Sequence, residues 1–183
     1  MSNKKLCFIH TETNNLHQTT DDVSKKNLFN FARLIKLNYE IGIMKNNEFI
    51  SEKCVETIIK PRACYISKEI TKINGITNEI ANANGIDPEI VLNEFKKDIK
   101  NVDIIINHNI DFHLKTIIAE SVRFNISIDF NKYIIIDIML FNKTNTFYKL
   151  SDLIKKYLKK SKDNTLTQIK KIFFQQYQEY LLP

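Results

Sequence analysis

The sequence is poor in the residues on which many small stabilised folds depend. Its 183 residues include no tryptophan and only three glycines, three prolines and three cysteines. An odd number of cysteines, without the spacing of a zinc ligand set, argues against a disulfide framework or a structural zinc site. Cys7, Cys54 and Cys64 each lie in or beside an apolar segment. We therefore expect all three to be buried free thiols.

Long hydrophobic runs are also missing, and we expect no leader segment. The apolar runs are interrupted by polar residues and stay well below the roughly 20 residues that a bilayer-spanning helix requires. The first residues, Met1 to Lys5, lead directly into a strand-like segment without a cleavage site of small residues. We expect an intracellular protein, cytoplasmic or nuclear, with no membrane partner. The length and the 43% of hydrophobic residues suit a single domain over residues 1–183.

The whole chain has a formal net charge of +6, and positive charge is concentrated in its last quarter. Between Lys149 and Lys171 eight lysines oppose two aspartates, so this window carries as much net charge as the whole chain. Such a surface contacts nucleic-acid phosphates in some proteins and is only a solvated helix face in others. The sequence leaves both readings open. The lysines that we consider for phosphate contact are Lys155, Lys156, Lys159 and Lys160.

Apolar patterning predicts five strands separated by polar turns. One begins at Cys7, and the others cover residues 32–42, 49–59, 102–106 and 133–140. Asn46-Asn47 is a hairpin turn between the second and third strands, and Pro61 ends the third because proline cannot donate to a ladder. The segment 102–106 is apolar apart from Asp103, which predicts burial on both faces.

Helical stripes and capping residues predict five helices. They cover residues 66–73, 87–99, 111–124, 151–160 and 165–180, with a further short turn at Thr77. Three consecutive strands followed by alternating helix and strand predict a mixed sheet flanked by helices, which is an α/β fold. Neighbouring strand ends converge on one crevice in such a sheet, and we expect a functional site there.

Four stretches in the same order carry a resemblance to a known family. They read Phe-Ile-His-Thr-Glu-Thr-Asn-Asn-Leu at 8–16, Ile-Asn-Gly-Ile-Thr-Asn-Glu at 73–79, His-Asn-Ile-Asp-Phe-His-Leu at 108–114 and Ile-Asp-Ile-Met-Leu at 136–140. These stretches resemble motifs of the DEDDh branch of the DnaQ-like 3′–5′ exonucleases. The resemblance covers nearly the whole chain, and it implies a ribonuclease H-like fold.

The resemblance also implies which residues occupy the catalytic positions. In that family four carboxylates hold two divalent ions, which activate water and polarise the scissile phosphate, and a histidine takes the proton. The first Asp falls on His10, the Glu on Glu12 and the second Asp on His113. The final His-x-x-x-x-Asp motif falls on residues 163–168, so that Asp163 replaces the base and Gln168 replaces the last ligand. Because no histidine follows His113, the general base is missing at any register.

The sister branch of the family uses Tyr-x-x-x-Asp in place of that last motif. Two formal matches occur, Tyr133 with Asp137 and Tyr148 with Asp152. The first pair lies on a predicted strand, where four residues separate side chains by about 13 Å. The second pair comes one helix too early in the chain. Neither pair is expected to restore the site.

We favour a catalytically inactive exonuclease-like domain, retained to bind nucleic acid or a protein. Two Mg²⁺ ions bring four positive charges, against which Glu12 and Asp163 supply at most two negative ones, so we expect no cofactor. Alternatively, His10, Glu12 and His113 hold Mn²⁺ or Zn²⁺ in an altered but active 3′–5′ exonuclease site. A third reading is a structural subunit of a polymerase or another nucleic-acid-processing complex, docked through the aromatic tail at 172–182.

For nucleic acid, we expect a single-stranded end, DNA or RNA, to run into the crevice. Aromatic side chains stack on bases and lysines contact the backbone in such sites. His108, Asn109 and Phe112 are candidates for lining the crevice. The same three residues are alternatively expected only to hold the strand-to-helix turn together.

Overall fold

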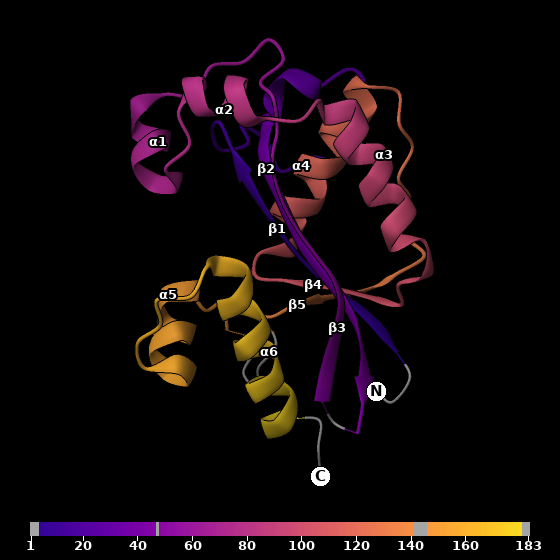
Figure 1. Ribbon diagram of the computed structural model, residues 1–183, viewed down its shortest axis with the longest axis vertical. Coiled ribbons are helices and arrows are strands. Elements are labelled where there is room, and N and C mark those ends of the chain that lie inside the picture. The colour runs from indigo at the N-terminus through magenta and orange to yellow at the C-terminus, as the bar shows by residue number, and fades with distance from the viewer. Residues whose placement is uncertain (1–3, 47, 141–145, 181–183) are drawn as a thin grey trace.

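A five-stranded mixed sheet forms the centre of the computed structural model, which describes residues 4–46, 48–140 and 146–180 (Figure 1). The strands are β1 (Lys5–Thr13), β2 (Leu34–Lys45), β3 (Glu48–Ile58), β4 (Ile104–Asn107) and β5 (Ile134–Asp137). Their order across the sheet is β3-β2-β1-β4-β5. The β1–β2 and β2–β3 pairs are antiparallel, whereas β1–β4 and β4–β5 are parallel. The predicted α/β fold with a three-strand meander is confirmed.

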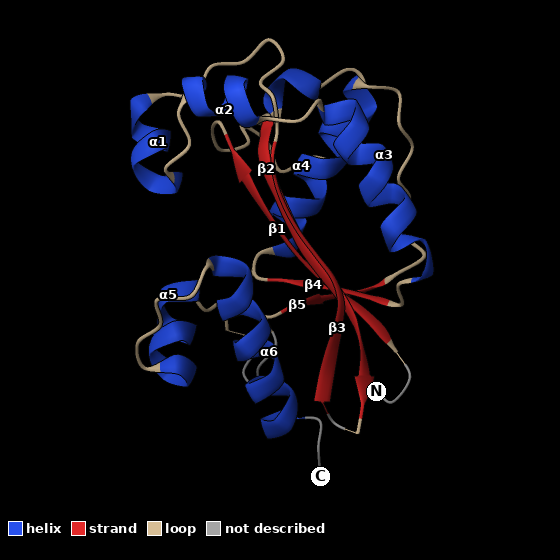
Figure 2. Ribbon diagram, viewed as in Figure 1, coloured by secondary structure: helices blue, strands red, loops and turns tan. Residues whose placement is uncertain are grey.

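Helices cover both faces of this sheet, as Figure 2 shows. They are α1 (Lys68–Asn74), α2 (Asn78–Asn84), α3 (Pro88–Asp98), α4 (Ile110–Arg123), α5 (Leu150–Leu153) and α6 (Thr165–Tyr180). Helices α3 and α4 pack on one face, and α5 and α6 pack on the other. None of the described helices combines the length and the apolar composition that crossing a membrane would take.

Local sequence signals set the beginnings of three helices. The side chains of Ser67, Thr77 and Asp87 each accept a hydrogen bond from a backbone N–H in the first turn of α1, α2 and α3. These caps satisfy donors that have no partner within the helix. Helix α1 ends at Gly75, whose φ of 75° is the left-handed conformation that glycine adopts without strain.

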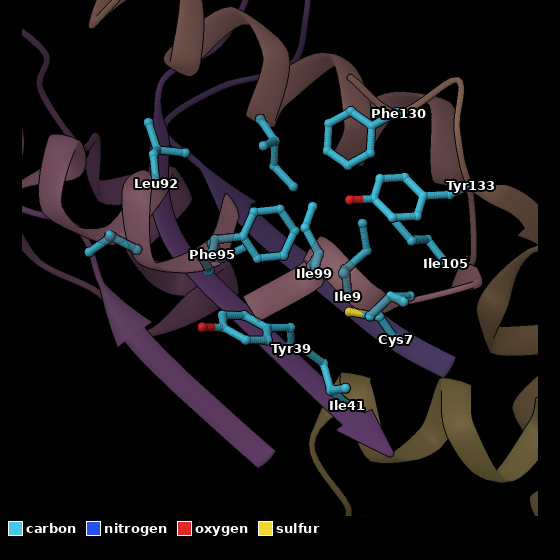
Figure 3. Close-up of a cluster of buried hydrophobic side chains, with 14 of the residues drawn as sticks. Cys7, Ile9, Tyr39, Ile41, Leu92, Phe95, Ile99, Ile105, Phe130 and Tyr133 are labelled. Carbon is cyan, nitrogen blue, oxygen red and sulfur yellow. The ribbon is translucent and has the colours of Figure 1, made fainter. Parts of the chain in front are cut away.

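Strand β1 is the element that joins the two hydrophobic layers. Its side chains alternate, so Leu6 and Phe8 pack in the cluster with α5 and α6, whereas Cys7 and Ile9 pack with α3 and α4. Figure 3 shows Cys7 and Ile9 within the second of these clusters, together with Phe95 of α3. All four of these β1 side chains are fully buried.

Two predicted elements are shorter or shifted in the structure. The last strand, predicted to reach residue 140, ends at Asp137 because the Leu140 N–H turns back to the Asp137 carbonyl. The helix predicted to be capped by Ser151 begins at Leu150 instead, with Lys149 at the N-cap. It continues as a π-helical turn at 154–158 and ends before Lys159, whose φ is 59°. The predicted short turn at Thr77 is the full helix α2.

The three cysteines are free, but only one is buried. Cys7 is buried, Cys64 is partly exposed and Cys54 is exposed. Cys54 lies on β3, which is an edge strand of the sheet and has most of its side chains in solvent. The prediction of three buried thiols is therefore wrong for Cys54 and Cys64. An apolar neighbourhood in sequence does not bury the edge strand that carries Cys54, and Cys64 lies in the segment between β3 and α1.

Phe8 provides a test of the layer between the sheet and α6. It is fully buried and makes edge contacts with Phe49, Phe173 and Phe174 at centroid distances of 5.5, 5.5 and 5.6 Å. We expect Phe8→Ala to lower the free energy of unfolding by about 3–5 kcal/mol in urea denaturation. Phe29→Ala is the matched control, because Phe29 is 79% exposed and should change stability by less than about 0.5 kcal/mol. Equal effects of the two variants would contradict the assigned packing.

Candidate functional site

A pocket of about 470 Å³ lies at the carboxyl end of β1. Its walls come from the end of β1, from α1, from the turn between β4 and α4, and from the first turn of α6. Because β1 and β4 run parallel, their carboxyl ends meet at the same edge of the sheet, as expected for a site in this kind of fold. His10, Glu12 and His113 all line this pocket, although His113 is more than one hundred residues from the other two in sequence.

His10 and Glu12 share one face of β1 and form a pair. The distance from His10 Nε2 to Glu12 Oε1 is 3.1 Å, so a proton on Nε2 is donated to the carboxylate. The other ring nitrogen of His10, Nδ1, is buried and has no hydrogen-bond partner among the described residues. The imidazole therefore fills the space beside Glu12 without a further polar anchor.

His113 is buried on α4 and is bound to the neighbouring strand. Its Nδ1 accepts a hydrogen bond from the Thr11 backbone N–H at 3.1 Å and lies 2.7 Å from Thr11 Oγ1. Burial, together with His10 and His108 nearby, holds the pKa of His113 well below its ordinary value of 6.5. The ring is therefore neutral, with its proton on Nε2. The rings of His10 and His113 lie 5.0 Å apart.

The turn before α4 is held by its own polar groups. Asn109 has a φ of 56°, and the N–H groups of Asn109 and Ile110 donate to the Asp137 carboxylate at 2.8 and 3.0 Å. His108 Nε2 donates to the Tyr148 carbonyl at 2.8 Å. These contacts favour the structural reading of His108 and Asn109, although both residues, and Phe112, also line the pocket.

These contacts also bear on the two tyrosine–aspartate pairs of the sequence. The Asp137 carboxylate caps α4, whereas Tyr133 is packed in the core on the α4 side of the sheet. Tyr148 contributes its carbonyl to His108, and Asp152 is exposed on α5. Neither Tyr133 and Asp137 nor Tyr148 and Asp152 line the pocket together.

Sequence reasoning missed His17, in the loop after β1. Its Nδ1 accepts from the Ala32 N–H at 3.1 Å, its Nε2 donates to the Phe112 carbonyl at 3.2 Å, and its ring stacks on Phe112 at 4.3 Å. Burial lowers the pKa of His17, and the bond to Phe112 only partly opposes that effect. His17 thus ties the loop to α4. The sequence offered one signal, which is that histidine is rare and that His17 is one of only four in the chain.

Helix α6 presents different residues to the pocket from those that the motif alignment predicted. Thr165 and Ile169 line the pocket, and Asp163 and Gln168 do not. Asp163 instead pairs with Lys171 at 2.7 Å, and Gln168 Nε2 donates to the Asp163 carbonyl at 3.0 Å. Asp163 and Gln168 are therefore engaged with each other and with Lys171, outside the set of lining residues.

The lysines proposed for phosphate contact are on the surface next to this region. Lys155, Lys156, Lys159 and Lys160 are all exposed, within or just after the π-helical turn that follows α5. None of them is among the residues that line the pocket. The Lys156 ammonium lies 4.7 Å from the centre of the Tyr157 ring. Two other lysines of the basic window are paired, Lys170 with Glu40 and Lys171 with Asp163.

The residues present do not fit a pair of divalent ions of the DEDDh kind. Glu12 is the only carboxylate among the described residues that line the pocket. In the described part of the chain, no three His, Cys, Asp or Glu side chains are grouped closely enough to hold a metal ion. His10 is turned to Glu12, and His113 Nδ1 is occupied by Thr11. The described lining residues therefore supply one carboxylate where the resembled enzymes have four.

A mixed sheet in the order β3-β2-β1-β4-β5, with a pocket where β1, α4 and α6 meet, defines an exonuclease-like domain of the ribonuclease H-like type. The family model described as Exonuclease, RNase_T, matches residues 7–179. The chain belongs to this exonuclease family, which confirms the resemblance carried by the four sequence stretches. No curated protein sequence matches the chain.

Solved structures of exonuclease I have the same fold. Escherichia coli exonuclease I in complex with a dT13 oligonucleotide is 13% identical, with a TM-score of 0.71 over 97% of this chain and 41% of that one. Exonuclease I from Methylocaldum szegediense is 15% identical, with a TM-score of 0.71 and coverages of 97% and 41%. The ExoI/SSB-Ct complex is 12% identical, with a TM-score of 0.70 over 97% of this chain and 42% of that one. This chain thus spans about two-fifths of the length of these proteins.

The buried neutral state of His113 predicts a pH dependence of stability. Because its pKa is lower in the folded chain than the ordinary 6.5, the unfolded chain binds more protons below pH 6.5. The His113 contribution to the free energy of unfolding is therefore complete above pH 6.5 and is lost as the pH falls below it. Urea denaturation between neutral pH and pH 5 would measure this loss.

His113→Asn is the matched variant for that measurement. The asparagine side chain keeps an acceptor for the Thr11 N–H but cannot titrate, so its stability should fall less steeply with acid than that of the parent chain. Identical pH profiles for the two proteins would show that His113 is not held neutral by burial.

Proposed function

We propose that this domain binds a single-stranded nucleic-acid end in the β1 pocket without hydrolysing it. The observation that carries the proposal is the set of side chains at the pocket. Imidazoles of His10 and His113 stand at two positions where the family resemblance implies acids, and α6 contributes Thr165 and Ile169. The fold and the pocket are retained, whereas the acids on which hydrolysis depends are replaced.

The argument against hydrolysis rests on charge and ligand chemistry. Mg²⁺ prefers oxygen ligands, and two such ions need several carboxylates to offset their charge. Glu12 alone cannot do this, and it already pairs with His10. No histidine lies in α6 to accept a proton from the attacking water. The proposed domain is therefore a binding module.

The argument for binding rests on the lining of the pocket. A volume of about 470 Å³ is within the range of small-molecule and nucleoside sites. Leu16 and Ile73 are 73% and 78% exposed at its rim, where they offer apolar contact to a base. The exposed lysines of the neighbouring turn, Lys155 to Lys160, supply positive charge for a backbone. E. coli exonuclease I, which has the same fold, was solved with dT13 and dA16.

A protein-docking role is less well supported. The aromatic residues of α6 that were considered for a partner are packed inside the domain, with Phe173 buried and Phe174 against Phe8 and Phe49. The rest of that tail, from residue 177 to 182, lies outside the described side chains. A nucleic-acid ligand and reduced cysteines both suit an intracellular location, which we include in the proposal.

Binding at the pocket is tested with Ile73→Ala against a matched exposed isoleucine, Ile90→Ala on α3. Ile73 lines the pocket and Ile90, which is 53% exposed, does not. Losing apolar contact with a base should weaken binding of a fluorescent oligothymidylate about fivefold for Ile73→Ala, with little change for Ile90→Ala. Equal affinity of both variants and the parent, or no binding at all, would refute the proposed site.

Hydrolysis is tested on the same protein, purified without a histidine tag. We expect no release of nucleotides from labelled single-stranded DNA or RNA with Mg²⁺, Mn²⁺ or Zn²⁺. The alternative site, with His10, Glu12 and His113 around Mn²⁺ or Zn²⁺, predicts metal-dependent trimming that Glu12→Ala abolishes. That result would show that the domain is an altered metal enzyme and not a binding module.

Restoring two acids should not restore the enzyme. We expect the double variant His10→Asp, His113→Asp to remain inactive with Mg²⁺, because α6 still presents Thr165 and Ile169 and supplies neither base nor ligand. The measurement is release of labelled mononucleotides, with circular dichroism to confirm that the variant is folded. Magnesium-dependent trimming by this variant would show that the C-terminal part of the site is intact.

A further inference from the structure

A second cavity, of about 350 Å³, lies next to the β1 pocket. Asn15 and Leu16 line both cavities, so these two residues form the wall between them. The second cavity is built from the loop between β1 and β2, residues 63–64 and the end of α4. Arg33 and Arg123 are its charged lining residues, and we call it the arginine cavity.

Arginine is scarce in this chain, and all of it is found here. Of 27 basic residues three are arginines, and the other 24 are lysines. Arg33 and Arg123 line the cavity, and the third arginine, Arg62, accepts a hydrogen bond from Arg33 through its carbonyl. Arginine differs from lysine in its planar fork of N–H donors, which matches two oxygens of a phosphate.

The two guanidinium groups are fixed in place by one carboxylate. Glu120, only 1% exposed, accepts from Arg33 Nη2 at 2.7 Å and from Arg123 Nη1 at 2.8 Å. Arg123 Nη2 also donates to the carbonyls of Leu28 and Phe31, both at 2.7 Å. The side chains are therefore held in one arrangement before any ligand arrives, which lowers the entropic cost of binding.

This arrangement leaves positive charge uncompensated. Two guanidinium groups face one carboxylate, and the described residues that line the cavity include no Asp or Glu. A purely structural tie between α4 and the loop would need one arginine for one glutamate, since a second buried charge costs desolvation. Arg33 also donates to Glu120 through Nε, so three of the five N–H donors of each arginine are engaged. The remaining donors are left for an anion. The amides of Gln18 and Asn30 complete a polar lining.

We propose that the arginine cavity holds a backbone phosphate of the strand whose end occupies the β1 pocket. This inference rests on the proposed function. Asn15 and Leu16 line both cavities, so one strand can contact both. Phe29 lines the arginine cavity and is 79% exposed, and Leu16, on the shared wall, is 73% exposed. Exposed apolar side chains beside fixed positive charge suit bases and phosphates of a single strand better than an acidic peptide.

The test introduces one negative charge without touching the Arg33–Glu120–Arg123 network. Gln18 is exposed and lines the arginine cavity, so Gln18→Glu places a carboxylate against the incoming phosphate. Gln175→Glu is the matched control, because Gln175 is exposed on α6 and lines neither cavity. At low salt we expect Gln18→Glu to weaken binding of an oligothymidylate about fivefold, with Gln175→Glu close to the parent.

The ligand supplies the second half of the test. Oligonucleotides in which a single linkage is a neutral methylphosphonate are compared, with the neutral linkage moved stepwise from the 3′ end. At the linkage that enters the arginine cavity, the parent should lose affinity and the salt dependence should fall by about 0.7 in log–log slope. At that same linkage the effect of Gln18→Glu should disappear, because there is no longer a charge to repel.

The outcomes separate this inference from the proposed function. If Ile73→Ala weakens binding while Gln18→Glu matches Gln175→Glu, the pocket binds the strand and the arginine cavity does not. If Gln18→Glu weakens binding equally at every neutral linkage, the charge acts at long range and the specific contact is refuted. Competition by an oligoglutamate peptide as strong as that by the oligonucleotide would assign the cavity to an acidic protein segment instead.

Discussion

The hydrogen bond from the Thr11 backbone N–H to His113 Nδ1 fixes the relation between the central strand and the helix that faces it. An uncharged imidazole accepts this bond inside the domain, where a carboxylate would require a compensating cation. The end of β1 and the start of α4 can therefore pack against each other with no ion between them. His10 is likewise hydrogen-bonded to a group of the protein itself, the carboxylate of Glu12 on the same strand.

The two hydrophobic layers of the fold do not depend on charged groups at the end of β1. The alternation of β1 keeps Leu6 and Phe8 in one hydrophobic layer and Cys7 and Ile9 in the other, whatever stands at the strand end. Asp137 caps α4, and His17 ties the loop to the same helix. The supporting structure around the pocket thus depends on backbone, imidazole and carboxylate contacts made within the protein.

Sequence reasoning located most of the fold because its signals are local. Asp87 and Gly75 mark helix ends through hydrogen bonds that involve only neighbouring residues. It failed at some element ends and on an edge strand. The early end of β5 is a local turn, from the Leu140 N–H to the Asp137 carbonyl, inside an apolar run that reads as a longer strand. The exposure of Cys54 follows from its place on an edge strand, which no local pattern reveals.

The site was predictable only in part. His10, Glu12 and His113 were found through the order of the motifs, and the structure brings them to one pocket. The lining residues of α6 were not identified, because Thr165 and Ile169 carry no chemical signal, and the motif positions Asp163 and Gln168 stay a prediction. The arginines gave no motif either. Their significance depends on Glu120, which meets Arg33 across 87 residues of sequence.

Strand β3, at the edge of the sheet, has a consequence for how copies of the protein meet one another. A long edge offers unpaired backbone groups to any second chain, and charged side chains on it discourage that pairing. Glu52 and Lys53 lie there, and each is paired across to the body of the domain, with Lys5 and with Asp98, both at 2.6 Å. A crowded solution of this protein should thus resist the growth of continuous sheets from one molecule to the next.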